Sequence, residues 1–335
     1  MKLGVDSYTL RNSGLDPLGV LQLARELGLD GVLFELSPFQ SLRDPDLERI
    51  RITAGELGLY LEFGMGSIFH GHPMADKGRR LLAEAGHNTD VSEAQTVIQH
   101  LEVARKLGSS ILRCVAGDLF TRDAGYDMAQ LADDAVNVLC EACRAADGMR
   151  MKIAMENHAD FTVRELAMIR DRVDSPAFGF TVDTANLAFD LDEPLRLTQL
   201  MAPDALTTHF KNYRVIRTPQ GLALENCTLG DGDIDQVVIA EILARYHPGL
   251  HLNIEIHSQF APFPLEILKP GYWDWHPSPP GDGLSWYLAK SWTRNDLPTP
   301  PANLADGPES WQLERKHLEQ SIDWARKALG HLLTR

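Results

Sequence analysis

Four apolar segments in the second half of the chain each end in a side chain that can bind a metal ion. The segments contain the words MENH, TVDT, TTHF and NIEI, and the groups in question are Glu156, Asp183, His209 and Glu255. Three carboxylates share a partly dry pocket only when a cation compensates their charge. Three oxygen donors and one imidazole suit Mn²⁺, Mg²⁺ or Co²⁺ better than a structural zinc. The pattern predicts one divalent metal ion with open positions for two adjacent sugar oxygens.

Taken singly, each of these residues is more often a helix cap, a loop hydrogen bond or a surface charge. The predicted secondary structure favours a shared metal site, because strands and helices alternate along the chain. Apolar or β-branched runs predict strands at 2–6, 31–35, 59–63, 110–115, 151–156, 178–183, 205–210 and 251–256. Amphipathic runs predict helices at 17–27, 45–57, 91–107, 128–146, 163–173, 193–201, 234–246 and 311–333.

Eight βα units favour a closed (β/α)8 TIM barrel, an α/β fold in which neighbouring strand ends meet at one mouth. A doubly wound open sheet is the alternative, but the first strand is followed by SYTLRNSG rather than a glycine-rich phosphate loop. We therefore expect the four metal-binding groups to converge at the barrel mouth.

The 335 residues are expected to form a single barrel, 1–335, with long loops after strands three and eight. The second of these, 257–310, is an aromatic-rich excursion that holds Trp273, Trp275, Trp286 and Trp292. Long connections in compact domains are usually functional. This segment is predicted either to close over a sugar ring as a lid or to form the interface of a homo-oligomer.

Composition limits the partners. Lys and Arg total 32 against 47 Asp and Glu, a formal net charge of −15, which opposes binding to nucleic acid. Four cysteines in so long a chain are too few for a disulfide framework. The N-terminus MKLGVDSYTL is too polar for a signal peptide, and a membrane-spanning apolar run is missing. A cytoplasmic protein with no membrane partner is expected.

Strand alternation adds further candidates, because residues two apart share a face. His158 shares the face of Glu156, Lys211 that of His209, and His257 that of Glu255. Lys211 is interpreted as a catalytic ammonium that polarises a carbonyl or holds a carboxylate; the alternative is a surface lysine. The two histidines are candidates for substrate contact or for orienting the ligands.

Arg113 lies within the fourth predicted strand, where a guanidinium needs a partner. It is expected to pair with a carboxylate or to bind an anionic substrate. Glu62 and Glu35, at the predicted ends of strands three and two, are candidates for that partner or for contact with substrate hydroxyls.

The words ENH (156–158), DTAN (183–186), HFK (209–211), LGDGDID (229–235) and IEIH (254–257) resemble those of a known family. The sequence is similar to the xylose isomerase-like barrels, the sugar phosphate isomerases and epimerases that include the ketose 3-epimerases. The resemblance runs from residue 1 to about 250 and includes the last helix. It implies that the four ligands bind one divalent ion. It also implies that Glu156 and Glu255 move a proton on a carbohydrate substrate through a metal-stabilised enediolate.

Two positions depart from the ketose 3-epimerases. Asn186 stands where those enzymes usually carry a histidine that contacts substrate, and Val215 stands where they carry an arginine, with Arg214 and Arg217 beside it. Asn186 and Arg214 are thus the candidates for those substrate contacts. An isomerase or epimerase is expected, with a lyase as the alternative: decarboxylation of a 3-oxo sugar acid, or β-elimination from a 3-oxo-glycoside.

Two further classes are less favoured. A related abasic-site endonuclease would use His70 and His72 as extra ligands, but the net charge of −15 opposes it. An inactive binding subunit would not require the intact set of four ligands.

Overall fold

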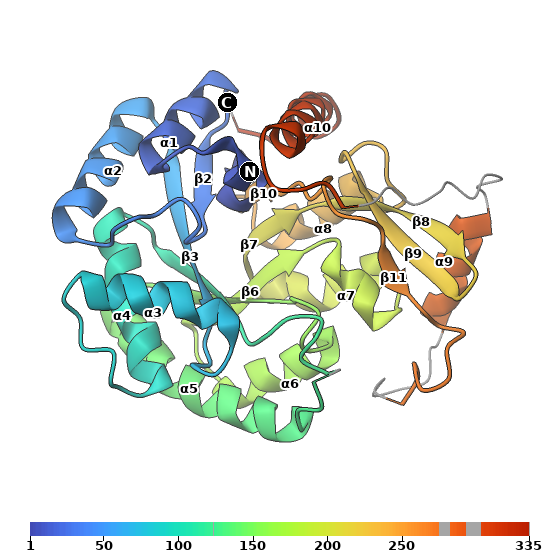
Figure 1. Cartoon of the computed structure of the whole chain (residues 1–335), viewed down its shortest axis with the longest axis horizontal. Coiled ribbons are helices and arrows are strands. Elements are labelled where there is room, and N and C mark those ends of the chain that lie inside the picture. Colours follow the sequence, from blue (N-terminus) through green and yellow to red (C-terminus); the bar gives the residue numbers. More distant parts are fainter. Residues whose placement is uncertain (123, 275–281, 293–302, 335) are drawn as a thin grey trace.

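Eight parallel strands close into a barrel in the order β1-β10-β7-β6-β5-β4-β3-β2, which confirms the predicted α/β fold (Figure 1). The structure, a computed structural model, describes residues 1–122, 124–274, 282–292 and 303–334. The barrel strands are β1 (Lys2–Asp6), β2 (Gly31–Phe34), β3 (Tyr60–Ser67), β4 (Ile111–Val115), β5 (Lys152–Glu156), β6 (Phe178–Asp183), β7 (Ala205–Phe210) and β10 (His251–Ile254).

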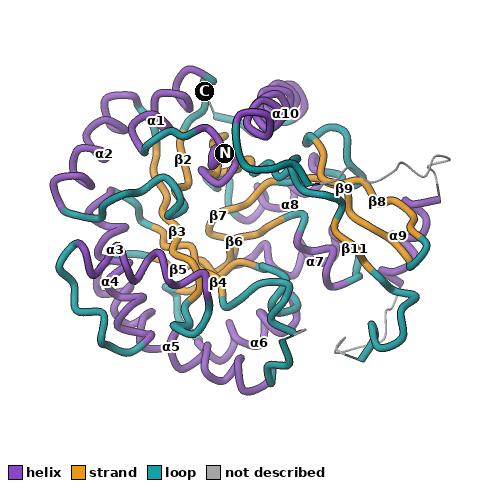
Figure 2. The backbone as a smooth tube through the Cα atoms, in the orientation of Figure 1, coloured by secondary structure: helices purple, strands orange, loops and turns teal. Residues whose placement is uncertain are grey.

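Helices surround the barrel, as Figure 2 shows. They are α1 (Pro17–Glu26), α2 (Asp44–Leu57), α3 (Asp76–Glu84), α4 (Glu93–Leu107), α5 (Met128–Met149), α6 (Val163–Val173), α7 (Pro194–Met201), α8 (Gln236–Tyr246) and α10 (Pro308–Ala328), whereas α9 (Asp282–Trp292) lies beside the barrel. Short 3-10 turns lie at Ser7–Ser13, Pro73–Ala75, Asn186–Asp190 and Ala202–Asp204. Across the described ranges, every helix is too short or too polar to cross a membrane.

Local chemistry explains where several helices begin and end. Asp16 caps α1 by accepting a backbone N–H with its side chain. Thr162 and Glu165 form a reciprocal capping box at the start of α6. Gly58 and Gly108 end α2 and α4 in the left-handed conformation, with φ of 69° and 94°, where a side chain would be strained.

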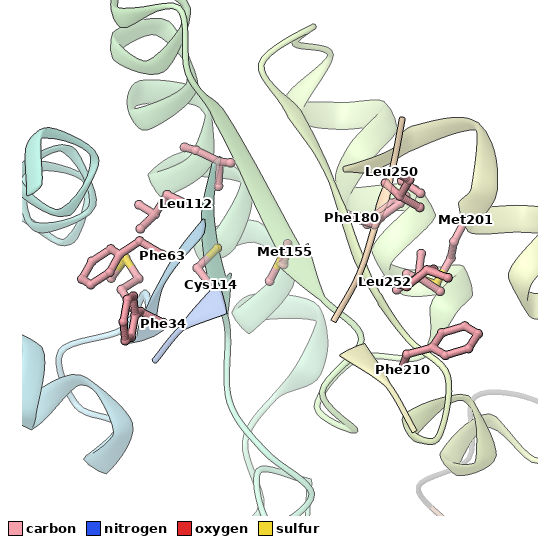
Figure 3. Packing of buried hydrophobic residues seen from close by; sticks show 14 of the residues in the cluster. Phe34, Phe63, Leu112, Cys114, Met155, Phe180, Met201, Phe210, Leu250 and Leu252 are labelled. Carbon is pink, nitrogen blue, oxygen red and sulfur yellow. The ribbon is translucent and has the colours of Figure 1, made fainter. Parts of the chain in front are cut away.

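Along β4 and β5, apolar side chains pack toward the helices and polar ones face the barrel interior. In β4, Leu112 and Cys114 are buried in the apolar core, whereas Arg113 between them forms ion pairs inside the barrel. In β5, Met155 belongs to the apolar core and Glu156 pairs with Arg113. Figure 3 shows Leu112, Cys114 and Met155 among the packed apolar side chains. The period of two residues therefore builds both the core and a polar interior.

A small second sheet was not predicted. After β7 the chain forms an antiparallel hairpin of β8 (Asn212–Thr218) and β9 (Gly221–Cys227), and β11 (Phe263–Leu265) adds to it in the order β11-β9-β8. Helix α9 packs on β8, so the excursion 257–310 contributes β11 and α9 to one structure beside the barrel (Figure 1). Trp275 lies outside the described residues. Trp292 is exposed and lies against the guanidinium of Arg217, 4.9 Å from the ring centre.

The N-terminal end of the barrel is filled by a polar group that we call the base network. It consists of Tyr60, Glu62, Thr207, His251 and Asn253. Glu62 accepts hydrogen bonds from Thr207 at 2.5 Å and from Asn253 at 3.0 Å, and its other oxygen lies 2.6 Å from Nδ1 of His251. Tyr60 stacks on the His251 ring, 3.6 Å between centroids, and donates its hydroxyl to Asn253 at 2.8 Å. Gly31 is required here, since a Cβ would lie 2.3 Å from the Tyr60 ring.

Candidate active site

The four predicted metal ligands meet at the C-terminal mouth of the barrel. Asp183 and His209 are register partners at the ends of β6 and β7, Glu156 ends β5, and Glu255 follows β10. Nδ1 of His209 lies 3.2 Å from Glu156, 3.0 Å from Glu255 and 3.9 Å from Asp183. All four residues are buried. Sequence reasoning thus identified four side chains that the fold does bring together.

These four residues belong to a larger group that we call the mouth cluster. It consists of Asp6, Glu35, Arg113, Glu156, Asp183, His209, Lys211 and Glu255. Lys211 is the buried ammonium of the cluster, with Nζ 2.7 Å from Asp183 and 2.8 Å from Glu255. Burial alone would lower the pKa of Lys211, but Asp183 and Glu255 raise it above its ordinary value. Lys211 is therefore a fixed positive charge beside the predicted metal ligands rather than a surface lysine.

Arg113 is the second buried cation of the cluster. Its Nε donates to Glu156 at 2.5 Å, and its Nη1 lies 3.2 Å from Glu35. Of the two expectations for Arg113, a carboxylate partner or an anionic substrate, the structure shows carboxylate partners. Gly64, the register partner of Arg113 on β3, leaves the space that Glu35 needs, because a Cβ there would lie 2.5 Å from a Glu35 oxygen.

Several buried atoms of the mouth cluster have no hydrogen-bond partner. They are both ring nitrogens of His209, Oε2 of Glu255, Oδ2 of Asp6 and Oε1 of Glu35. Buried polar atoms in folded proteins are nearly always satisfied, so a set of orphans at one place calls for an explanation. The donor atoms of Glu156, Asp183 and His209 lie within 4.8 Å of one another, close enough to hold one metal ion. The residues present therefore fit a divalent cation.

The electrostatics of the cluster separate its carboxylates. Burial would raise the pKa of Glu156, but Arg113 and His209 lower it well below its ordinary value. Burial raises the pKa of Asp183 to about 7, although Lys211 opposes the shift. The ionised form of Asp183 is thus disfavoured by burial, and a bound cation or a proton would relieve that cost.

Two of the predicted substrate-binding residues, Asn186 and His257, contact the predicted metal ligands. The Asn186 amide donates to Asp183 at 2.9 Å and lies 3.4 Å from Glu156. Nε2 of His257 lies 2.5 Å from Glu255, and its ring meets the edge of Tyr8 at 5.1 Å between centroids. Burial and the nearby Lys211 lower the pKa of His257 to about 4, so a neutral ring holds Glu255 in place.

Three other predicted contacts make their hydrogen bonds or ion pairs outside the cluster. His158 hydrogen bonds through Nδ1 to the carbonyl of Gly117 at 2.9 Å. Arg214 leaves the barrel on β8, where it pairs with Glu225 at 3.3 Å on the hairpin. Glu62 lies in the base network, because β3 continues to Ser67 and Glu62 is near its start rather than its end.

The two histidines considered for an endonuclease serve local structure. Nε2 of His70 lies 2.8 Å from the hydroxyl of Thr96, and Nδ1 of His72 accepts the N–H of Met74 at 3.2 Å. Neither contact involves the mouth cluster.

Sequence reasoning missed two contributors. Asp6 ends β1 with a buried carboxylate that lies 3.3 Å from Nε2 of His209. The signal was the same as for the four predicted metal ligands, an ionisable residue that ends a strand. Asn157 bridges β5 and β6: its amide donates to the Asp183 carbonyl at 2.9 Å and its oxygen accepts the Asp183 N–H at 2.8 Å. The middle residue of ENH therefore fixes the backbone of a metal-type ligand.

Comparison with known proteins agrees with this architecture. The family model described as "Xylose isomerase-like TIM barrel" matches residues 21–270. Over 245 residues the chain is 22% identical to 3-oxo-isoapionate decarboxylase of Pectobacterium atrosepticum, covering 70% of this chain and 78% of that protein.

Two solved structures share the fold. D-psicose 3-epimerase from Clostridium cellulolyticum H10, solved with D-tagatose, superposes with a TM-score of 0.60 and 16% identity, over 98% of this chain and 99% of that one. A xylose isomerase-like TIM barrel protein from Mycobacterium smegmatis, in complex with magnesium, gives a TM-score of 0.59 and 16% identity over 87% and 97%. At these identities the similarity is one of fold.

Proposed function

The chain belongs to the xylose isomerase-like TIM barrel family, and from this premise we propose that it is a divalent-metal-dependent enzyme acting on a keto sugar or keto sugar acid. One observation carries the proposal: three carboxylates and an imidazole meet at the barrel mouth with orphaned buried atoms. A carbohydrate substrate accords with the sugar-metabolising relatives in the family.

Glu156, Asp183, His209 through Nδ1, and Glu255 would hold the metal ion. Their donor set suits Mn²⁺ or Mg²⁺, with Co²⁺ as a further choice, and a magnesium complex is known for a protein of the same fold. When bound, such an ion supplies positive charge for the oxyanion that develops as a bond beside a carbonyl breaks.

Lys211 complements this charge from the protein side. Its ammonium is buried, fixed by Asp183 and Glu255, and carries a raised pKa, so it retains its proton. A group of this kind is a poor proton donor but a strong hydrogen-bond donor to a developing oxyanion. We assign Lys211 the role of polarising the keto oxygen of the substrate.

The surroundings of the two glutamates favour loss of CO₂ over movement of a proton. One Glu156 oxygen is held by Arg113 at 2.5 Å. The two Glu255 oxygens lie 2.5 Å from His257 and 2.8 Å from Lys211. A base needs a carboxylate oxygen directed at the substrate, and the cationic or imidazole neighbours of these three oxygens oppose that use.

Decarboxylation of a 3-oxo acid requires no such base. The C–C bond breaks, its electron pair moves toward the keto oxygen to form an enolate, CO₂ leaves, and a proton later adds to the carbon. Positive charge at the keto oxygen is the main requirement, and Lys211 contributes it. The similarity to 3-oxo-isoapionate decarboxylase supports this choice. We therefore propose a lyase that decarboxylates a 3-oxo sugar acid.

A ketose 3-epimerase is the second candidate. It is favoured by the fold match to D-psicose 3-epimerase over 98% of this chain, and by the presence of two glutamates beside Nδ1 of His209.

A panel of keto sugars and 3-oxo sugar acids with Mn²⁺ in D₂O, followed by NMR, distinguishes the two. Release of bicarbonate from an acid supports the lyase, whereas deuterium exchange beside a ketone without CO₂ supports the epimerase. The chelated enzyme is the matched control. Equal turnover before and after chelation would show that the reaction does not need a metal ion. Formation of a β-elimination product would show that the enzyme is an eliminating lyase rather than a decarboxylase.

A further inference from the structure

His209 has carboxylates beside both of its ring nitrogens. Nδ1 faces Glu156 and Glu255, while Nε2 faces Oδ2 of Asp6 at 3.3 Å. Asp6 is fully buried, and its Oδ2 has no hydrogen-bond partner. Its other oxygen, Oδ1, accepts the backbone N–H of Tyr8 at 2.6 Å, which caps the turn after β1. The cap therefore orients the Asp6 carboxylate so that one oxygen is aimed at the histidine.

The two nitrogens of a neutral imidazole have opposite roles, since only one of them carries the proton. A metal ion on Nδ1 requires that nitrogen to be unprotonated, so the proton resides on Nε2. That N–H is buried and needs an acceptor, and Oδ2 of Asp6 lies where the acceptor must be. We propose that Asp6 is a positioning residue that holds His209 in the Nε2–H form, with Nδ1 directed at the metal. This inference rests on the proposed function, because it assumes that His209 binds a metal ion.

A second cation beside Nε2 is the competing explanation, because Asp6, Glu35 and His209 also have donor atoms within 4.8 Å of one another. Arg113 opposes it. Its Nη1 lies 3.2 Å from one Glu35 oxygen and 3.4 Å from the other, and the guanidinium is held there by Glu156. A cation beside Nε2 would be repelled by the fixed charge of Arg113, and it would require that both ring nitrogens of His209 be unprotonated. A proton bound to Nε2 avoids both of these costs.

The orientation of Asp6 makes its amide variant informative. In Asp6→Asn the side-chain oxygen can keep the Tyr8 cap, which places the NH₂ group opposite Nε2 of His209. An N–H donor there favours the unprotonated Nε2 and moves the ring proton to Nδ1, the form that cannot bind metal. Asp6→Ser keeps a capping oxygen but is too short to reach the ring. Both variants preserve the turn and remove the acceptor.

Glu35→Gln is the matched control, because Glu35 is a carboxylate of the same cluster whose partner is Arg113 rather than His209. The experiment measures the Kd and stoichiometry of Mn²⁺ for each folded protein from the electron paramagnetic resonance signal of free Mn²⁺. Loss of a group that orients a metal-binding histidine typically weakens binding about 10- to 100-fold. We expect that loss in Asp6→Asn and Asp6→Ser, and a much smaller change in Glu35→Gln.

A wild-type Kd in Asp6→Asn would overturn the inference, because a cap alone would lower the thermal midpoint without changing Mn²⁺ affinity. Two Mn²⁺ ions per wild-type chain, reduced to one in both Asp6→Asn and Glu35→Gln, would also overturn it in favour of a second cation. If the wild-type chain binds no Mn²⁺, the proposed function fails and this inference with it, which is a different result from either of the others.

Discussion

The two ends of the barrel both bury polar side chains, but they satisfy them differently. In the base network every side-chain polar atom of Glu62, Thr207 and Asn253 has a hydrogen-bond partner. In the mouth cluster both nitrogens of His209 and one oxygen each of Asp6 and Glu255 have none. A completed network stabilises the fold, whereas an incomplete one keeps its binding capacity for a ligand. The difference separates the end that supports the barrel from the end that we propose carries the chemistry.

The largest effect should come from removing charge at the mouth. Glu156→Gln and Glu255→Gln should each lower kcat by about 10³-fold or more, as for other groups that act on developing charge. Each variant loses an anionic metal ligand while keeping its shape, so circular dichroism should show an unchanged fold. Full turnover in either protein, measured with added Mn²⁺, would contradict the assignment of the mouth cluster.

A substitution in the base network should lower stability and leave kcat unchanged. Glu62→Ala leaves Thr207, Asn253 and His251 without their shared acceptor, so the free energy of unfolding should fall by about 3 kcal/mol. Urea denaturation measures this loss. The folded fraction should retain the wild-type kcat, because Glu62 does not touch the mouth cluster. A large loss of kcat with unchanged stability would reverse the roles of the two ends.

Metal binding should stabilise only proteins with an intact mouth. At a Mn²⁺ concentration of about 100 times Kd, linkage predicts a gain near 2.7 kcal/mol in the free energy of unfolding. The wild type and Glu62→Ala should both show the gain, and Glu156→Gln should not. Differential scanning calorimetry with and without chelator provides the comparison, and equal gains in all three proteins would point to binding elsewhere.

The smallest effect is a dependence on pH. Burial raises the pKa of Asp183 to about 7 from an ordinary 3.8, so the ionised side chain costs the metal-free fold stability above pH 7. That cost fades as the pH falls toward 3.8, whereas a bound metal needs Asp183 ionised and must then displace a proton. The proton on Asp183 alone should therefore reduce the Mn²⁺-induced stabilisation by about 1.4 kcal/mol for each pH unit below 7. Parallel calorimetry at pH 8 and pH 6 tests this, and an equal gain at both would contradict it.

Much of this arrangement was accessible from sequence patterns. The eight βα units predicted the closed barrel, and the polar ends of four strands predicted the side chains that meet there. Asp6 ends β1 in the same way and could have been found by the same rule. The hairpin of β8 and β9 also carries a signal, since two β-branched or apolar runs flank the turn TPQG. It was overlooked because it interrupts the βα alternation.

The position of a residue along the barrel axis could not be predicted from the sequence. Strand alternation places Glu62 inside, but the sequence does not tell where β3 begins and ends, and β3 continues to Ser67. Glu62 was therefore assigned to the mouth, although it lies at the base with Asn253 and His251. Likewise, alternation along a single strand cannot tell that Arg113 lies between Glu35 and Glu156.

By itself, then, the sequence determined which chemical groups end the strands and which face each presents, because side-chain direction alternates with a period of two along any strand. Only the tertiary structure decided which of these groups are satisfied. Asp6 faces His209, and Glu62 reaches Asn253, because closure pairs β1 and β7 with β10 and brings together residues more than 180 positions apart. Those contacts depend on register and barrel closure, which no local pattern encodes. They also decide which end of the barrel has atoms left for a ligand.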